Sequence, residues 1–315
     1  MSVFLNTFLP DTDPSSKLQV VDRGLSKQSA EASASPYKLI EEEDIRGMVK
    51  PRMPFSHKGT YGHALIIAGE IRTMGAAMLS AKGCLYGGAG LTTLSIPESG
   101  LTALNATLPE VMFLERKQLI KMKSLKKYNA VAIGPGIGKL LDGMAVLEGL
   151  FTLKRPIVAD ADALGLLGEH QDLLYHLPKD SVLTPHVKEF DGLFGKHKNW
   201  WERLQTARME AKKLGAVIVL KNQFTFIIDQ QGDVMINQTG NPAMAQGGMG
   251  DVLTGLIAAY VAQGYSAKAA AILACFFHGK AGDELAVHSI NVTASQVAQE
   301  IPKAVKRFID FKPED

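Results

Sequence analysis

Short apolar runs alternate with helical patterns along most of this chain. Nearly continuous apolar runs that end in Gly, Pro or Asp predict buried strands at residues 64–69, 91–97, 130–136, 156–162, 181–186 and 216–221. Between them, apolar positions recur at helical spacing, most clearly at residues 74–88, 140–153 and 201–214. This alternation predicts an α/β fold with a doubly wound, mostly parallel sheet and right-handed crossovers.

The pattern changes after the last of these runs. Residues 225–238 (TFIIDQQGDVMINQ) hold two β-type runs around a Gln-Gln-Gly-Asp turn, which predicts a hairpin that adds antiparallel strands at one sheet edge. The rest of the chain is helical, with helices predicted at residues 251–263, 267–287 and 294–309. Gly264 follows the first of these helices, at a position where glycine commonly ends a helix.

Residues 1–50 differ from the rest in composition. DTDPSSK (11–17) and SKQSAEASASP (26–36) are rich in Ser, Asp, Ala and Pro, and one short strand-like piece, LQVVD (18–22), lies between them. We expect residues 1–50 to be an N-terminal extension with weak structure, and residues 51–315 to form the folded domain.

Composition and charge narrow the class of protein. Apolar residues make up 46% of the 315 residues, which is enough for a substantial core in a globular protein. The 34 basic and 32 acidic residues give a net charge of +2. The Lys-rich segment from Arg116 to Lys127 lacks the interleaved aromatic residues of a nucleic-acid groove, so we interpret it as a solvated face and expect no nucleic-acid partner.

Targeting signals and cysteine chemistry are also weak in this sequence. The start MSVFLNTFLP has no basic region, and no apolar run reaches the ~18 residues of a membrane span, so we expect a cytoplasmic protein with no membrane partner. Cys84 and Cys275 are the two cysteines, each inside an apolar helical pattern. We expect buried thiols rather than a disulfide or a zinc site.

A glycine cluster precedes the predicted helix at 251–263. Gly247, Gly248 and Gly250 lie at its N-terminus, where the first N–H groups have no partners within the helix and the helix dipole is positive. Glycine also lets a phosphate approach the backbone closely. The cluster therefore predicts an anion hole, although it lacks the Lys-Ser/Thr of a P-loop.

Asp251 stands directly beside this predicted anion hole. A carboxylate there would repel phosphate, so its presence needs a reason. Two roles remain open from the spacing, and they can coexist: Asp251 caps the helix, or it acts as a general base on a hydroxyl that attacks a phosphoryl group.

The order of several motifs carries a resemblance to a known family. Gly-Gly-x-Gly-Asp at the start of an apolar helix resembles the ribokinase-like fold. The full set resembles the nucleotide-dependent NAD(P)H-hydrate dehydratases within that fold, over about residues 51–311. The motifs are HKGTYGHALIIAGE (57–70), MGAAMLSAKGCLYGGAGLTTLSIPE (74–98), AIGPGIG (132–138), LTPHVKEF (183–190), VIVLKNQFT (217–225) and TGNPAMAQGGMGDVLTG (239–255).

The resemblance implies a three-layer α/β/α sandwich and a specific reaction. In that family ADP or ATP, with Mg²⁺, phosphorylates the C6 hydroxyl of hydrated NADH or NADPH, and loss of phosphate restores the reduced nicotinamide. It implies that Asp251 is the base on that hydroxyl. The amides of Gly248, Met249 and Gly250 would then form the anion hole.

The same resemblance assigns substrate contacts to three residues. Gly136 of GPGIG and Ala76 of MGAA would lie against the hydrated dinucleotide, although GPGIG alone is also typical of a tight turn. His186 follows a predicted strand, where open α/β sheets place ligands, and TPHxxEF favours a substrate contact over a purely structural histidine. Glu189 is the candidate that orients the metal ion or its waters.

The nucleotide contacts are implied for the loop after the strand at 216–221. The family usually has Lys-Gly-x-x-Thr there, and this chain has Lys221, Asn222, Gln223, Phe224 and Thr225. A lysine at a strand end can pair with phosphate and a threonine can donate its hydroxyl, whereas an exposed lysine there would also be ordinary. Asp160 and Asp162 could bind a metal ion or cap the next helix, and we favour capping.

Three departures from the family pattern bear on nucleotide binding. Met249 replaces Thr or Ser, Asn222 replaces the loop glycine, and Val187-Lys188 replaces Pro-Gly. Backbone donors survive all three changes, and Asn tolerates a positive φ better than most residues. We therefore expect the loop to persist, with an altered nucleotide affinity.

Further expectations come from fused relatives and from alternative functions. LQVVDRGLS (18–26) and SPYKLIEEEDI (35–45) are similar to the end of the epimerase domain that precedes the dehydratase in fused members, and too little remains for an epimerase site.

The resemblance also implies a homo-oligomer, with a tetramer as the expected form. The alternative functions are a ribokinase-like kinase of a vitamin precursor or sugar, and a nucleotide-binding protein without turnover.

Overall fold

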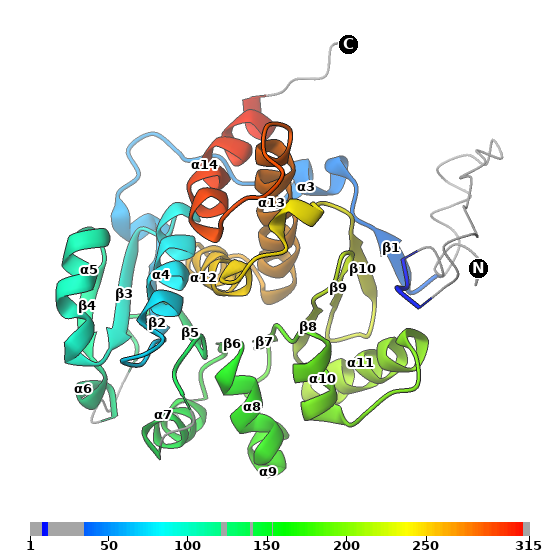
Figure 1. The fold of residues 1–315 in the computed structure, drawn as a ribbon, viewed down its shortest axis with the longest axis horizontal. Coiled ribbons are helices and arrows are strands. Elements are labelled where there is room, and N and C mark those ends of the chain that lie inside the picture. The colour runs from blue at the N-terminus through cyan, green and yellow to red at the C-terminus, as the bar shows by residue number, and fades with distance from the viewer. Residues whose placement is uncertain (1–7, 12–34, 121–124, 139–140, 153, 311–315) are drawn as a thin grey trace.

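One mixed sheet organises the part of the chain that the structure describes. The structure is a computed structural model, and it describes residues 8–11, 35–120, 125–138, 141–152 and 154–310. Within these residues the strand order is β1-β10-β9-β8-β7-β6-β5-β2-β3-β4 (Figure 1). The strands are β1 (Tyr37–Leu39), β2 (His63–Ile67), β3 (Leu91–Ile96), β4 (Met112–Glu115), β5 (Ala130–Ile133), β6 (Val158–Ala159), β7 (Val182–Leu183), β8 (Val217–Leu220), β9 (Thr225–Ile228) and β10 (Val234–Asn237).

The central strands are buried on both faces, as their continuous apolar runs predicted. In β2, Ala64 and Ile66 face one core cluster while Leu65 and Ile67 face the other. Strands β8, β7, β6, β5, β2, β3 and β4 run parallel to one another. Two apolar faces need two helical layers to cover them, so this pattern requires a three-layer sandwich.

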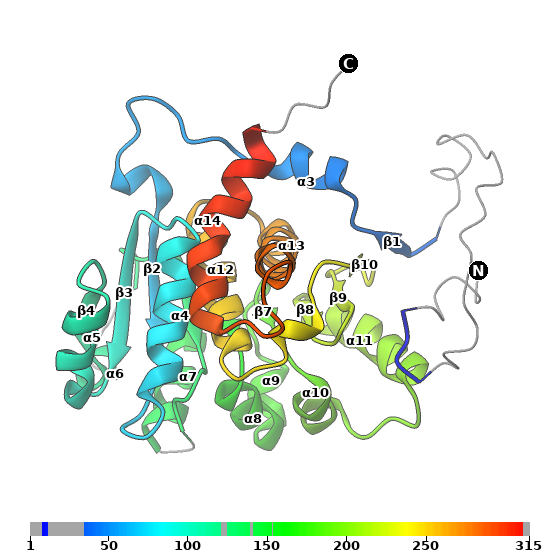
Figure 2. The same ribbon diagram turned by 45° about the horizontal axis from the view of Figure 1, so that its top comes forward.

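The helices form those two covering layers (Figure 1). On one face lie α3 (Glu42–Met48), α4 (Met74–Tyr86), α5 (Leu101–Thr107), α12 (Met249–Ala262), α13 (Ala267–Ala286) and α14 (Ala294–Asp310). On the other lie α6 (Arg116–Ile120), α7 (Leu141–Thr152), α8 (Asp162–Glu169), α9 (Gln171–Leu174), α10 (Val187–Phe194) and α11 (Trp200–Leu214). Short 3-10 turns are η1 (Lys58–Tyr61), η2 (Glu98–Gly100) and η3 (Pro242–Met244). Figure 2 shows α14 running alongside α4, which confirms the predicted α/β/α layering.

The predicted hairpin is present, but it is not the outermost part of the sheet. β9 pairs antiparallel with β8, and β10 pairs antiparallel with β9. Beyond them β1 pairs parallel with β10, and β4 closes the opposite edge beside β3. Sequence analysis missed both edge strands, and β1 lies in the segment that was expected to be weakly structured.

The expected weak structure of residues 1–50 is wrong for residues 37–48. β1 joins the sheet, α3 packs against α13, and the Ile45 side chain has no exposed surface. Phe8 and Leu9 are also buried, in the cluster beneath α11. The strand-like segment LQVVD lies outside the described residues.

The interpretation of the Lys-rich segment as a solvated face is wrong for Arg116. Its guanidinium is buried, and it donates to the Ser95 carbonyl oxygen at 3.0 Å and to the Ala68 carbonyl oxygen. It also pairs with Glu70 at 3.3 Å. Arg116 therefore ties the ends of β2 and β3 to α6, a role that a count of charges cannot reveal.

No helix among the described residues is both long and apolar enough to cross a membrane.

Candidate active site

Side chains from several strand ends converge at one edge of the sheet. The chain runs outward from β2 through β3 to β4 and then returns to β5 on the other side of β2. Open α/β sheets bind ligands outside the carboxyl ends of their strands at such a reversal. The ends of β2, β5, β6, β7 and β8 carry, in that order, Thr73, Gly136, Asp160, His186 and Lys221.

The start of α12 faces this edge with free backbone amides. Gly248 is the residue before the helix, and its φ of +89° is a left-handed value that favours glycine. A Cβ at Gly248 would also lie 2.4 Å from the Leu79 side chain on α4. The amides of Met249 and Gly250 follow in the first turn, where helical N–H groups have no intrahelical partner. This geometry can stabilise a bound anion.

Asp251 does not cap this helix, so the capping interpretation is wrong. The capping position belongs to Gly248, and Asp251 is the third residue of α12. Burial, followed by the negative charge of Asp160, raises the pKa of Asp251 to about 7, although Lys221 opposes the rise. A carboxyl group with a pKa near neutrality can accept a proton from a hydroxyl at physiological pH.

Lys221 lies beside the start of α12, in a buried charged network. Its Nζ is 2.7 Å from Asp160 Oδ1 and 3.8 Å from Glu189 Oε2. Burial opposes the lysine charge, but Asp160 and Glu189 outweigh it and raise the pKa of Lys221. The lysine therefore carries its positive charge next to Gly250, where a phosphate could pair with it.

Asp160 belongs to this network and caps no helix, so the capping interpretation is wrong for this residue. Its side chain is almost fully buried, and its Oδ2 accepts a hydrogen bond from Thr254 Oγ1 at 2.7 Å. The α8 helix begins after Ala161, and Asp162 Oδ2 accepts instead from the Gly138 amide at 2.9 Å. Asp162 thereby holds the AIGPGIG turn in place.

His186 and Glu189 form a capping box at the start of α10. The His186 Nδ1 accepts from the amides of Lys188 and Glu189 at 3.1 and 3.2 Å, and the Glu189 carboxylate accepts from the His186 amide at 2.8 Å. The His186 side chain is nonetheless 52% exposed at the end of β7. Both predicted contacts thus have a structural role and still face the edge where ligands would bind.

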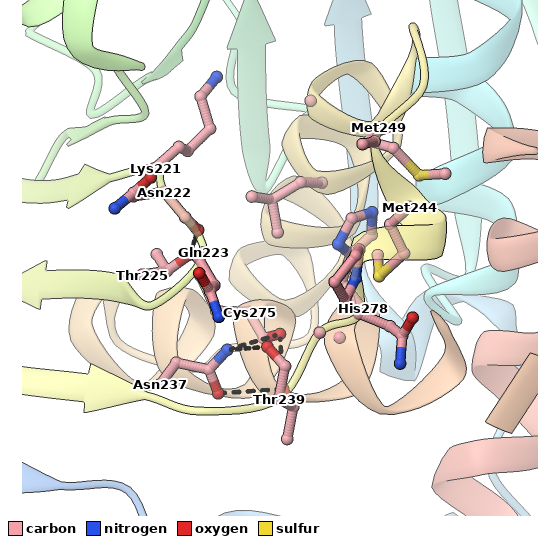
Figure 3. A pocket seen from close by; sticks show the side chains of 17 residues that line it. Lys221, Asn222, Gln223, Thr225, Asn237, Thr239, Met244, Met249, Cys275 and His278 are labelled. Atoms are coloured by element: carbon pink, nitrogen blue, oxygen red, sulfur yellow. Dashed lines mark hydrogen bonds between the residues drawn. The ribbon is translucent and has the colours of Figure 1, made fainter. Parts of the chain in front are cut away.

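A cavity of about 440 Å³ lies next to the start of α12. Figure 3 shows the 221–225 loop on one side of it and Met244, Met249 and His278 on the other. Its lining residues are Lys221, Asn222, Gln223, Thr225, Asn237, Thr239, Gly240, Asn241, Pro242, Met244, Ala245, Met249, Gly250, Leu253, Cys275, His278 and Gly279.

The 221–225 loop supplies this cavity with most of the residues predicted to contact a nucleotide. Phe224 is not part of the lining, and its ring instead packs edge-on against Phe8 with centroids 5.0 Å apart. Asn222 has no positive φ, so the backbone here needs no glycine. This explains how the loop tolerates Asn222 in place of the family's glycine.

Ala76 and Gly136 lie together on the other side of α12, outside this cavity. The Thr73 hydroxyl donates to the Gly136 carbonyl oxygen at 2.6 Å, and Ala76 is half-buried in the first turn of α4. Gly136 has a φ of +62°, and a Cβ there would lie 2.8 Å from the Thr73 Cβ. The structure therefore groups the predicted site residues into two sets, one that lines the cavity and one around Thr73.

Sequence reasoning missed Thr254 and His278, and it considered Asp160 only as a metal ligand or a helix cap. Thr254 lies one turn after Gly250 in the helical pattern. His278 lines the cavity from α13, and burial lowers its pKa to about 4, so that its ring is neutral. No sequence signal separates His278 from an ordinary core histidine.

Comparisons with known proteins agree with this geometry. The family model for NAD(P)H-hydrate dehydratase matches residues 64–303. The ADP-dependent (S)-NAD(P)H-hydrate dehydratase of Lactococcus lactis is 33% identical over 273 residues, which cover 85% of this chain and 98% of that protein. The chain spans about half the length of the bifunctional NAD(P)H-hydrate repair enzymes, with 51% of the Escherichia coli one covered.

Solved structures show the same relationship. A crystal structure of the ADP/ATP-dependent NAD(P)H-hydrate dehydratase of Bacillus subtilis, co-crystallised with ATP and Mg²⁺, is 30% identical with a TM-score of 0.76, covering 85% of this chain and 97% of that one. A ribokinase-like superfamily protein of Enterococcus faecalis is 26% identical with a TM-score of 0.79, covering 87% and 96%. The fold is ribokinase-like, and the chain belongs to the NAD(P)H-hydrate dehydratase family.

Proposed function

We propose that this protein dehydrates hydrated NADH or NADPH at the expense of ADP or ATP. The C6 hydroxyl oxygen of the hydrate attacks the terminal phosphoryl group of the nucleotide, and the hydroxyl proton passes to a base. The phosphoanhydride bond to that phosphoryl group breaks, and AMP or ADP leaves with its electron pair. Phosphate then leaves C6 with the electron pair of the C–O bond, and loss of a proton from C5 restores the double bond of the dihydronicotinamide. Phosphate is a far better leaving group than hydroxide, so phosphorylation by the nucleotide makes the elimination easier.

Asp251 is the residue that supports this proposal. Its carboxyl group has a pKa near 7 and lies in the first turn of α12, beside backbone amides that can stabilise an anion. In our proposal Asp251 takes the proton from the C6 hydroxyl. The amides of Gly248, Met249 and Gly250 then stabilise the transferring phosphoryl group, together with Lys221. Met249 replaces a usual hydroxyl residue, so its backbone amide is the donor that remains.

The two sets of site residues fit the two substrates. We assign the nucleotide to the 440 Å³ cavity and the 221–225 loop, with Lys221, Asn222, Gln223 and Thr225 as contacts. We assign the hydrated dinucleotide to the side of Ala76, Gly136 and His186. In this proposal Asp251 acts where a hydroxyl from the dinucleotide meets a phosphoryl group from the nucleotide.

Magnesium is the proposed metal ion. Among the described residues no group of three or more His, Cys, Asp or Glu side chains could hold an ion by itself. Mg²⁺ commonly keeps several waters and binds through one or two carboxylates plus substrate phosphates, so Glu189 fits as a carboxylate that holds it through water. When bound, the ion would neutralise charge on the phosphates.

The remaining assignments are proposals about the whole protein. We propose a cytoplasmic homo-oligomer, with a tetramer as the expected form. We further propose that residues 51–315 are the dehydratase domain, and that residues 1–50 derive from the end and linker of an epimerase domain.

The test mixes the pure protein, Mg²⁺, hydrated NADH or NADPH, and ADP or ATP, and follows the return of the reduced-nicotinamide absorbance. We expect absorbance to return only when a nucleotide is present, with phosphate released in equal amount. No return with either nucleotide would reject the dehydratase. Accumulation of a stable phosphate ester would instead identify a kinase of the same fold.

A further inference from the structure

Asp160 is a buried carboxylate for which the reaction proposed above has no direct use. It follows β6, and 1% of its surface is exposed. Its Oδ1 lies 2.7 Å from Lys221 Nζ, and its Oδ2 accepts from Thr254 Oγ1 at 2.7 Å. One carboxylate therefore joins the lysine of the 221–225 loop to the helix that carries Asp251.

The backbone around Asp160 is strained, which indicates that its position matters. Ala161 has a φ of +49° and a ψ of −122°, an unfavourable conformation for a residue with a Cβ. Gly134 leaves room for this turn, since a Cβ there would lie 1.8 Å from the Asp160 carbonyl oxygen. Backbone strain of this kind concentrates at functional sites.

Asp160 also lies close to the place where phosphate would bind. A Cβ on Gly250 would be 3.4 Å from Lys221 Nζ and 3.6 Å from Asp160 Oδ2. The charged groups that act on Asp251 are Asp160, Lys221, Asp162 and Glu189, and the negative charge of Asp160 is the strongest among them. Asp160 therefore acts on the lysine by contact and on the base through space.

We propose that Asp160 is a positioning residue of the reaction, which holds Lys221 beside Gly250 and links it through Thr254 to the helix that bears Asp251. This inference rests on the proposed function and deepens it. Asp160 is not among the residues that line the cavity assigned to the nucleotide. It keeps the phosphate-pairing lysine in place before the nucleotide arrives, and its negative charge strengthens Asp251 as a proton acceptor.

The first experiment compares Asp160→Asn with the wild type in the dehydratase assay over a range of pH. We expect kcat to fall about 10- to 100-fold, because small misplacements of catalytic groups cost rates of this order. KM for the nucleotide should change much less than kcat. The acid limb of the pH profile should move to lower pH, because one negative charge beside Asp251 is gone. Asp172→Asn, an exposed carboxylate on α9, is the matched control and should change neither quantity.

Substitutions of Thr254 test the hydrogen bond between Thr254 and Asp160 with a smaller chemical change. Thr254→Val removes the hydroxyl that donates to Asp160 and keeps the shape of the side chain, so kcat should fall in the same direction but less. Thr254→Ser restores the hydroxyl and should restore the rate. Should Asp160→Asn not fold, this pair carries the test.

Two results would overturn the inference. The first is a wild-type kcat and pH profile in Asp160→Asn or in Thr254→Val. The second is a lower kcat with an unmoved acid limb in Asp160→Asn, which is the outcome of a merely structural role.

A third measurement separates this inference from the proposed function. NMR titration of the Asp251 carboxyl needs no turnover, and Asp160→Asn should lower its pKa relative to the wild type. A wild type without dehydratase activity rejects the proposed function, and the titration still decides the inference. If the Asp251 pKa in Asp160→Asn equals the wild-type value, the inference about Asp160 is rejected.

Discussion

Asp251 is the residue on which the proposed chemistry depends. It must be ionised to accept a proton, so a pKa of about 7 means that activity rises as pH increases through this value and is lost below it. Asp251→Asn removes the base and keeps the size of the side chain. We expect kcat to fall about 100- to 10,000-fold, with the acid limb of the profile lost and nucleotide affinity close to the wild type, as calorimetry would measure it. A variant that kept its rate would refute the assignment.

His278 gives a pH dependence of the same sign, in stability rather than in rate. Its pKa is lowered by burial to about 4, below the usual value of 6.5, so the unfolded chain binds a proton more readily than the folded one. Stability from this residue is therefore present above about pH 6.5 and is lost as pH falls toward 4. His278→Gln should flatten the loss of unfolding free energy between pH 7 and pH 4, by up to about 3 kcal/mol. Denaturant unfolding of both proteins at several pH values measures it, and parallel curves would contradict it.

At the scale of the element, the contact between α4 and α12 sets the position of the helix that carries Asp251. A Cβ on Gly255 would lie 1.8 Å from the Ser80 carbonyl oxygen, so the two helices cannot keep their distance with any larger residue there. We expect Gly255→Ala to lower the unfolding free energy by about 1–3 kcal/mol. It should also lower kcat, because Asp251 shifts with its helix. Gly149→Ala on α7 is the control, since nothing lies within 4 Å of its added Cβ, and it should stabilise slightly. Equal effects of the two changes would reject this account.

At the scale of the whole molecule, residues 37–48 belong to the folded unit. Ile45 on α3 is fully buried in the core that α13 and α14 share, although it lies in a segment expected to be weakly structured. Ile45→Ala should cost about 2–5 kcal/mol of unfolding free energy, measured by denaturant titration. Glu43→Ala, an exposed change on the same helix, should stay within about 0.5 kcal/mol of the wild type. A small effect at Ile45 would mean that α3 contributes little to stability.

Several features of the fold followed from local pattern alone. Continuous apolar runs predicted the central strands, because a strand covered by helices on both faces must be apolar at every position. The helix before Gly264 and the hairpin at 225–238 were also predicted, since their signals lie within a few neighbouring residues. The glycine cluster predicted the helix start at Gly248, where a left-handed φ and a close approach to Leu79 both require glycine.

The sequence by itself thus determined the α/β class, the family and the identity of the candidate base. Tertiary structure alone decided that Asp160 meets Lys221 and Thr254, that Arg116 is buried, and that β1 and β4 close the sheet. The physical reason is the separation along the sequence of the residues that interact. Strand and helix signals arise between residues a few positions apart, whereas Asp160 and Thr254 are separated by 94 positions in the sequence. Their contact, and the charge that it places beside Asp251, exist only once the sheet has brought β6, β8 and α12 together.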